Sequence, residues 1–359
     1  MKKALIVLLM LAVMAGGLFA EISLSGSASS GLAVFIGDDV LFATYNNPDR
    51  SIFQSSISVS GKNEAGTAGA SLGLGWNFGG VSGSSGNAWF KPLDSLTVNI
   101  GRNWNWWKAN PPGFIGDANN QIDVGFGLFL DGNPGGGLRW GAGIYPTYND
   151  GSFGGFGDAR YGGYLIYNLG IVEVGANIDY NGNNHWGGPG SGKVDATVGV
   201  GTNVAGISLA VDAWVQNLQD FSASGDLQVG PEIGFGAGDL SATLGGIVFV
   251  PVSGQKLGVY GNLSGDYPVT DAITASLAVG FSLKQALEAS NGTFNFWTAG
   301  SIPQGYATEV DSSVLGINPN LAINLSAGGS LNIGYGFATN IGGAKAMQNA
   351  IYAYYTIGF

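Results

Sequence analysis

The chain ends in AIYAYYTIGF, residues 350–359, which has the side-chain pattern of a β-strand. None of these residues is charged, and odd and even positions differ in kind. One set is Ile351, Ala353, Tyr355, Ile357 and Phe359, and the other is Tyr352, Tyr354, Thr356 and Gly358. Because successive side chains of a strand point to opposite sides of its sheet, the alternation predicts a strand with one largely apolar face.

Alternation with a period of two recurs along most of the chain. Between residues 68 and 78, and again between 122 and 130, apolar residues alternate with Gly, Ser, Asn or Asp. We identify about eighteen such segments, each near the roughly 9–11 residues with which a tilted strand crosses a bilayer. They are residues 21–36, 51–60, 67–78, 86–91, 95–103, 121–130, 138–146, 160–168, 171–180, 193–201, 206–216, 225–236, 241–250, 256–264, 271–282, 314–325, 330–338 and 349–359.

The connections between these segments alternate in length. One set is short and rich in Gly, Pro, Asn and Asp, whereas the other includes long stretches such as 104–120 and 283–313. This asymmetry is typical of outer-membrane barrels, with short periplasmic turns and long extracellular loops. We therefore predict an all-β fold, a transmembrane antiparallel β-barrel of about 18 strands, with 16 as the alternative count. A soluble β-sandwich or β-helix fits less well, because the second face is rich in glycine and the apolar face stays uncharged.

The first residues, MKKALIVLLMLAVMAGGLFA, have the three parts of a secretory signal peptide. Two lysines precede a short apolar run, and small residues follow it. We expect residues 1–20 to be a signal peptide cleaved after Ala20, and residues 21–359 to form a single outer-membrane barrel domain. An uncleaved membrane anchor is the alternative, although the apolar run is shorter than the roughly 20 residues of a spanning helix.

Composition narrows the range of partners. The chain has 24 acidic and 13 basic residues, which argues against binding to nucleic acid. Aromatic residues make up 12% of it, which argues against disorder. It contains no cysteine and therefore holds no disulfide.

With its predicted signal peptide, its alternating segments and its final residues, the chain resembles bacterial outer-membrane β-barrel proteins of the porin type. In that family an aromatic residue ends the last strand, and the barrel-assembly machinery reads that strand. Tyr355, Ile357 and Phe359 match this assembly signal. The resemblance implies outer-membrane lipids, the assembly machinery and small solutes or ions as partners, and it allows a homotrimer. It also implies a water-filled channel for passive diffusion of small hydrophilic solutes.

The parity of a residue, its odd or even position along an alternating strand, decides which face of the sheet its side chain is on. Parity assigns several charged side chains to the inner face of the predicted barrel. The pore-lining candidates are Asp123, Arg139, Glu173, Asp179, Asp195, Asp212 and Glu232. Acids outnumber bases in this set, and acidic rings favour cations, so the pattern predicts a cation-preferring channel. Glycine is frequent on the same face, as in Gly199 and Gly201. Strand glycines mark close approach of another backbone, so we expect either a wide lumen or room for a loop folded inside.

The stretch RNWNWWKANPPGF, residues 102–114, is the most distinctive loop. Trp104, Trp106 and Trp107 could stack on a sugar or another flat solute, or they could belong to an aromatic girdle at the membrane interface. A solute-specific porin therefore stands beside general diffusion as an alternative. A further alternative is a surface-exposed adhesin or structural barrel, in which long loops such as 283–313 bind an external partner and the lumen is plugged.

No motif predicts an enzyme, a cofactor or a metal site. The stretch GGPGSGKV, residues 187–194, imitates a phosphate-binding loop, but Val194 stands where Ser or Thr is needed and no helix is predicted after it. His185 is the single histidine, and its sequence neighbours supply no acid or nucleophile.

Overall fold

The barrel is formed by strands drawn from almost the whole length of the chain. The computed structural model describes residues 21–36, 40–45, 53–77, 80–102, 111–115, 126–145, 148–149, 152–153, 158–181, 184–185, 188–189, 192–224, 226–250, 252, 257–283, 313–325, 328–341 and 347–358. The predicted signal peptide and Phe359 lie outside these residues. Within them, no helix is both long and apolar enough to cross a membrane.

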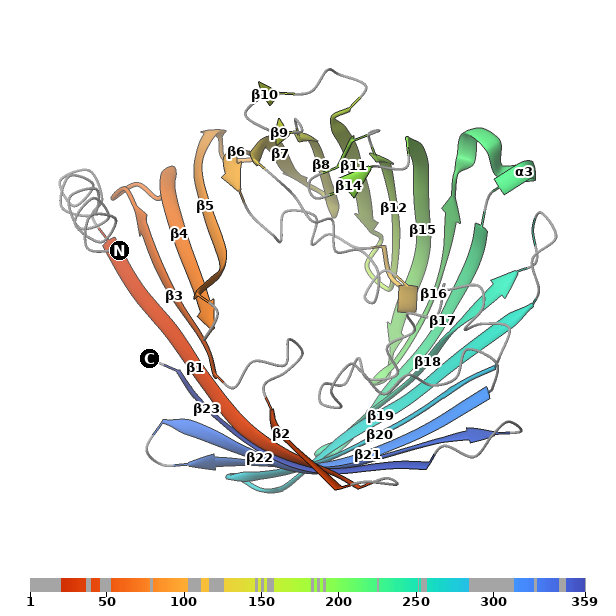
Figure 1. Ribbon diagram of the computed structural model, residues 1–359. Coiled ribbons are helices and arrows are strands. Elements are labelled where there is room, and N and C mark those ends of the chain that lie inside the picture. Colours follow the sequence, from red (N-terminus) through yellow and green to blue (C-terminus); the bar gives the residue numbers. More distant parts are fainter. Residues whose placement is uncertain are drawn as a thin grey trace.

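Eighteen antiparallel strands close into one barrel, which confirms the predicted fold and the higher of the two strand counts (Figure 1). They are β1 (Glu21–Ile36), β3 (Phe53–Lys62), β4 (Ala68–Asn77), β5 (Gly80–Leu93), β6 (Leu96–Arg102), β7 (Phe126–Gly135), β8 (Leu138–Tyr145), β11 (Arg160–Asn168), β12 (Val172–Asn181), β15 (Lys193–Val204), β16 (Ile207–Gln216), β17 (Asp226–Ala237), β18 (Leu240–Val250), β19 (Gly258–Thr270), β20 (Ile273–Ser282), β21 (Ser313–Leu325), β22 (Gly329–Ile341) and β23 (Met347–Gly358). The remaining elements are β2 (Val40–Tyr45), β9 (Tyr148–Asn149), β10 (Ser152–Phe153), β13 (Asn184–His185), β14 (Gly188–Pro189), the 3₁₀-helix η1 (Leu218–Asp220) and the helix α3 (Phe221–Ser224).

Several elements differ from the prediction. β5 spans Gly80–Leu93 instead of 86–91, and β19 continues to Thr270 instead of ending at 264. β2 was not expected, because VLFATY lacks a clear alternation. It pairs with the second half of β1, from Gly31 to Ile36, whereas β3 pairs with the first half, so β2 and β3 together line one side of β1. β7 extends to Gly135, within the predicted turn, because its ladder with β8 continues past a register shift between Gly132 and Gly135.

The first and last strands form the seam that closes the barrel. β1 pairs with β23 in an antiparallel register from Ser27 opposite Gly358 to Ile36 opposite Asn349. A closed ring has no unpaired strand edge, as the hydrocarbon of a bilayer requires. The apolar end of the chain is therefore one side of the closing seam.

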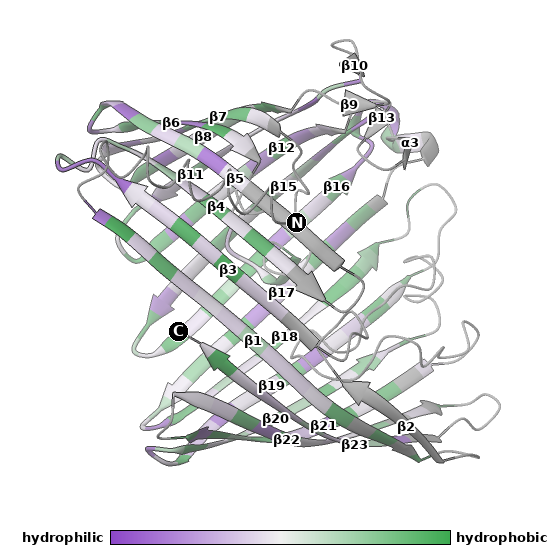
Figure 2. Cartoon of the chain, turned by 60° about the vertical axis from the view of Figure 1, so that its left-hand side comes forward, coloured by the Kyte–Doolittle hydropathy of each residue, from purple (hydrophilic) through white to green (hydrophobic). Residues whose placement is uncertain are grey.

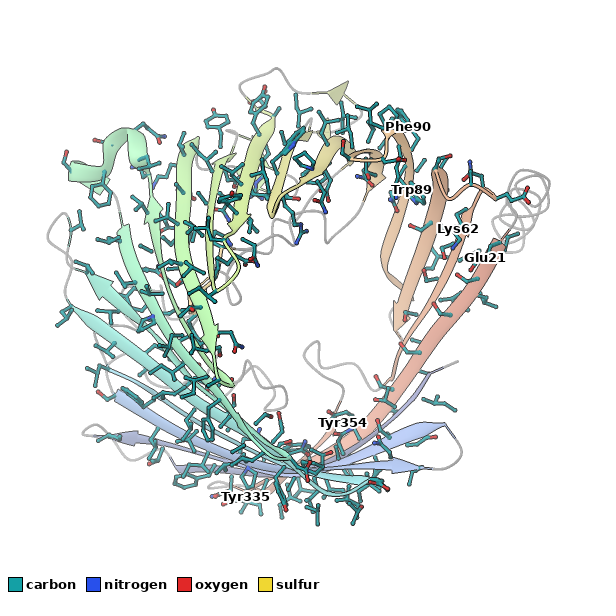
Figure 3. The ribbon with its side chains drawn as sticks, turned by 180° about the vertical axis from the view of Figure 1, so that it is seen from behind. Glu21, Lys62, Trp89, Phe90, Tyr335 and Tyr354 are labelled. Atoms are coloured by element: carbon teal, nitrogen blue, oxygen red, sulfur yellow. The ribbon has the colours of Figure 1, made fainter. Side chains whose placement is uncertain are left out.

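The two faces of the sheet have different side chains, as the alternation predicts. Large apolar residues point outward, and Leu24, Ile178 and Leu244 are 61%, 53% and 52% exposed. Figure 2 shows hydrophobic positions alternating with polar or neutral ones along the strands. Figure 3 shows Tyr354 pointing into the barrel and Tyr335 away from it. The outer surface is therefore the apolar one, as contact with lipid requires.

Several aromatic residues on the outer face lie near the short turns. Phe90, Tyr167, Phe235 and Tyr267 are all exposed, and each lies within a few residues of a short connection. Aromatic belts of this kind sit at the headgroup level of a membrane. At the same end, Glu21 Oε2 and Lys62 Nζ form an exposed ion pair of 2.8 Å between β1 and β3 (Figure 3).

The seam leads to a stability prediction. An added Cβ at Gly31 would lie 2.4 Å from Tyr354 Cβ and 2.5 Å from the Ala353 carbonyl oxygen. We expect Gly31→Val to lower the free energy of unfolding by about 2–3 kcal/mol, because overpacking forces the two strands apart. Urea unfolding in detergent measures this, with Ser25→Val on the same face of β1 as the control. Equal stabilities for the two variants would contradict the tight seam.

Candidate functional site: a segment inside the barrel

A short segment, residues 111–115, lies inside the barrel against the wall formed by β12 and β15–β18 (Figure 1). It belongs to the connection between β6 and β7, which the sequence analysis identified as the most distinctive loop. Pro111, Gly113, Phe114 and Ile115 are all buried, and Ile115 is only 1% exposed. The loop therefore sends this part of its sequence inward and seats it on the wall.

Glycines of the wall make room for the segment. A Cβ added at Gly175 would lie 2.8 Å from Pro111 Cα, and one at Gly199 would lie 2.1 Å from the Pro112 carbonyl oxygen. At Gly245 an added Cβ would lie 2.1 Å from Phe114 Cδ2. Real Cβ atoms do not come this close, so these three wall positions have to be glycine while the segment lies against them. Of the two explanations for the glycine-rich face, a loop folded inside is the one found on this part of the wall.

Asp212 holds the segment by a hydrogen bond to its backbone. The Ile115 N–H donates to Asp212 Oδ1 at 3.2 Å, and the carboxylate is 1% exposed. Gly113, at φ +138°, passes so close that an added Cβ would lie 2.3 Å from Asp212 Cγ. A backbone N–H buried without a partner is costly, so this bond helps fix the segment in place.

Apolar side chains hold the far end of the segment. The Phe114 and Tyr260 rings have centroids 6.0 Å apart, and Ile247 is paired with Tyr260 across β18 and β19. Ile247 and Tyr260 are each 2% exposed. The segment is therefore anchored both by hydrogen bonding and by burial of apolar surface.

Six of the seven predicted pore-lining residues lie on described strands and on the inner face. Arg139, Glu173, Asp179, Asp195, Asp212 and Glu232 come from β8, β12, β15, β16 and β17. The outer surface exposes residues that directly adjoin them in the sequence, namely Val174, Ile178, Val211 and Ile233. Because neighbouring side chains of a strand point to opposite faces, the charged residues point inward. Asp123 lies outside the described residues.

Three of the predicted acids are engaged with donors of the protein itself. Arg160 Nε donates to Asp179 Oδ1 at 2.9 Å, and the Asn217 N–H donates to Asp195 Oδ1 at 2.9 Å. Asp212 lies under the inward segment. These carboxylates fix elements of the barrel to one another, so the count of acids overstates the negative charge offered to a solute. The predicted cation preference consequently loses much of its basis.

Arg160 and the cluster around Tyr164 are functional candidates that the sequence did not predict. Arg160 opens β11 and shares its inner parity with Tyr164, which was a usable signal. The Tyr164 hydroxyl donates to Asp131 Oδ1 at 3.1 Å, and its ring stacks with Phe129 at 6.3 Å between centroids. Arg139 also interacts with Tyr164. This cluster holds β7, β8 and β11 together on the inside.

The remaining candidates of the sequence analysis are the three tryptophans, the single histidine and the stretch that imitates a phosphate-binding loop. Trp104, Trp106 and Trp107 lie outside the described residues. His185 is part of the small hairpin of β13 and β14, and Lys193 opens strand β15, so the helix that a phosphate-binding loop needs is not there. In the described part of the chain, no group of three or more His, Cys, Asp or Glu side chains could hold a metal ion.

Two of the three residues of the predicted assembly signal, Tyr355 and Ile357, lie on the outward face of the last strand, and the third, Phe359, lies outside the described residues. Ile351 and Ile357 are exposed on the outer face of β23, and Tyr352 on the inner face is 1% exposed. Tyr355 shares the outer parity with Ile357 and lies close to Gly329 of β22. Their role as an assembly signal stays a prediction.

Comparison with known proteins places the fold. No protein-family model matches the chain, and no curated protein matches it in sequence. Solved structures do match. Pseudomonas aeruginosa OpdL has a TM-score of 0.59 at 12% identity, over 95% of this chain and 99% of that one. The outer-membrane protein OpdK of the same organism has a TM-score of 0.59 at 10% identity, over 96% and 100%.

The chain has the fold of an outer-membrane porin barrel. A third match, Pseudomonas aeruginosa OccK2 (OpdF) in complex with glucuronate, gives a TM-score of 0.59 at 10% identity, over 95% of this chain and 99% of that one. At such low identities the similarity establishes the porin fold. It does not establish what this barrel transports.

The glycine wall generates a prediction about the inward segment. We expect Gly199→Ala to displace residues 111–115, because the new Cβ would meet the Pro112 carbonyl oxygen. The chain has no cysteine, so an Ile115→Cys background can report exposure by the rate of thiol labelling. Labelling should become faster in Gly199→Ala and stay unchanged in Gly86→Ala, where the nearest atom to an added Cβ is 3.4 Å away. Equal rates would show that the segment does not rest on Gly199.

The Asp212 hydrogen bond generates a second prediction in the same assay. Asp212→Ala leaves the Ile115 N–H without its acceptor, which costs about 1–3 kcal/mol and should speed labelling about fivefold or more. Asp212→Asn keeps an acceptor oxygen at the same place and should change the rate much less. If both variants label alike, the carboxylate does not hold the segment.

Proposed function

We propose that the protein is an outer-membrane channel through which small hydrophilic solutes diffuse passively, and that residues 111–115 narrow its lumen. The observation that carries this proposal is the seating of that segment on a glycine wall inside an 18-stranded barrel. Barrels of 16–18 strands leave an aqueous channel unless something fills it. A segment fixed on one side of the wall reduces such a channel in width.

We propose that the chemical structure of a solute decides whether it passes, more than the sign of its charge does. Three predicted wall acids are bonded to protein donors, so strong cation preference does not follow from the wall. Structures with the same fold include OccK2 (OpdF) in complex with glucuronate and OpdK with vanillate. These ligands belong to those proteins, and they support solute passage as a function of the fold.

The proposal includes the route to the membrane. Residues 1–20 are proposed to be removed as a signal peptide, and the outer face of β23 with Phe359 to be read by the barrel-assembly machinery. The exposed apolar surface and the aromatic belt support residence in a lipid bilayer. We propose no catalytic activity and no cofactor.

Single-channel recording in a planar bilayer tests the function. Refolded protein under a salt gradient should give stable current steps with a reversal potential close to zero. Asp212→Ala should increase the conductance or its noise, because it loosens residues 111–115, whereas Gly86→Ala should match the native chain. Insertion without current would contradict the channel and favour the alternative of a plugged barrel whose outer loops bind a partner. A strongly cation-selective reversal potential would restore the acidic-wall prediction.

A further inference from the structure

Charge is distributed unevenly around the inner face. The charged inner residues described above all lie on β7, β8, β11, β12, β15, β16 and β17. By contrast, the seven strands β20, β21, β22, β23, β1, β3 and β4 contain only two charged residues, Glu21 and Lys62. These two pair with each other at the short-turn end. Because the seven strands are neighbours in the barrel, they form one continuous wall that is uncharged apart from this ion pair.

Hydroxyl and amide groups take the place of charge on this wall. The inner positions of β1 and β3 are a ladder of serines, in which Ser25 is opposite Ser58 and Ser27 is opposite Ser56. The Ser27 and Ser56 hydroxyls form a hydrogen bond of 2.9 Å, and those of Ser23 and Ser60 one of 2.6 Å. Asparagine, serine and tyrosine residues of β21–β23 continue the wall, and Tyr354 of β23 points into the barrel (Figure 3).

The serine ladder is available for further hydrogen bonds. Ser25, Ser27, Ser56 and Ser58 are all exposed on the inner face. A hydroxyl has one donor and two acceptor sites, so a pair of bonded serines still offers a donor and several lone pairs. A wall of this kind presents donors and acceptors side by side, which is the complement of a solute that carries many hydroxyl groups.

The inward segment lies on the charged side of the barrel. Its contacts are with Gly175, Gly199, Asp212, Gly230 and Gly245, on β12 and β15–β18. Figure 1 shows this segment beside β16 and away from β1 and β3. It therefore covers part of the charged wall, including Asp212, and leaves the serine ladder uncovered.

We propose that the preferred solutes are neutral and polyhydroxylated, as sugars and polyols are, and that they pass along the uncharged wall. This inference rests on the proposed channel function. A neutral polyol can exchange its hydrogen bonds with water for bonds to the serine ladder at little cost. An ion gains no counter-charge from that wall to offset the water it loses. The wall thus favours neutral polyols, because it offers them hydroxyl groups and offers ions no opposite charge.

Liposome swelling tests the preference. Vesicles containing the native chain should swell faster in a neutral sugar or polyol than in a charged organic solute of similar mass. Replacing Ser25, Ser27, Ser56 and Ser58 together by Ala removes the two inner pairs of the ladder, keeps the Ser23–Ser60 pair at the short-turn end, and leaves no serine of the two replaced pairs unmatched. The ratio of the two swelling rates should fall about fivefold, which corresponds to the loss of one hydrogen bond in the rate-limiting position. Ion conductance should stay unchanged.

A matched control removes hydroxyls from the other side. Ser208→Ala with Thr243→Ala changes two inner residues of β16 and β18, which flank Gly234 on the charged half. This double variant should keep the native swelling ratio. Native channels that conduct ions but show no preference for the polyol would overturn this inference and leave the channel function standing. An unchanged ratio in the serine variant would equally overturn it. The absence of any current would instead contradict the proposed channel function, on which this inference rests.

Discussion

The structure depends on backbone hydrogen bonding around a closed ring. In hydrocarbon an unpaired N–H or C=O group costs several kcal/mol, so a sheet in a membrane must have no free edge. Here the pairing of β1 with β23 removes the last two edges. Gly31 allows this pairing, because no side chain fits between its backbone and that of Tyr354. The uncharged, aromatic end of the chain follows from the same constraint, since one face of β23 must meet lipid.

A closed barrel of this size creates a second requirement, which is to control the space it encloses. The chain meets it with a segment folded inside and a wall shaped to receive it. Gly175, Gly199 and Gly245 lack the side chains that would block the segment, and Asp212 supplies an acceptor for its backbone. Strand glycines weaken a sheet, so their concentration here indicates that close approach of the segment matters more than strand propensity.

The same arrangement divides the inner surface into two kinds of wall. Charged groups on β7–β17 are largely bonded to one another or to backbone donors, as Arg160 and Asp179 are. Serine, threonine, asparagine and tyrosine line the wall from β20 to β4. The segment lies against the first wall, so in the proposed channel a solute meets mainly the second. A porin-type fold with such a division can select neutral solutes without any ring of like charges.

Sequence alone predicted the β-barrel, narrowed the strand count to 18 or 16, and assigned the outward face of each strand, because a period of two is a local property that each strand displays by itself. The closed structure then decided the count of 18. Sequence reasoning also offered a loop folded inside as one of two explanations for the glycine-rich face, beside a wide lumen. It did not show which residues would lie there, or that Asp212, separated by 97 positions from Ile115, would bind it. Nor could parity reveal that Asp179 and Asp195 are engaged, since their partners come from other strands and turns. Those facts depend on the register and curvature of the closed sheet, which bring distant residues to one place, and only the tertiary structure decides them.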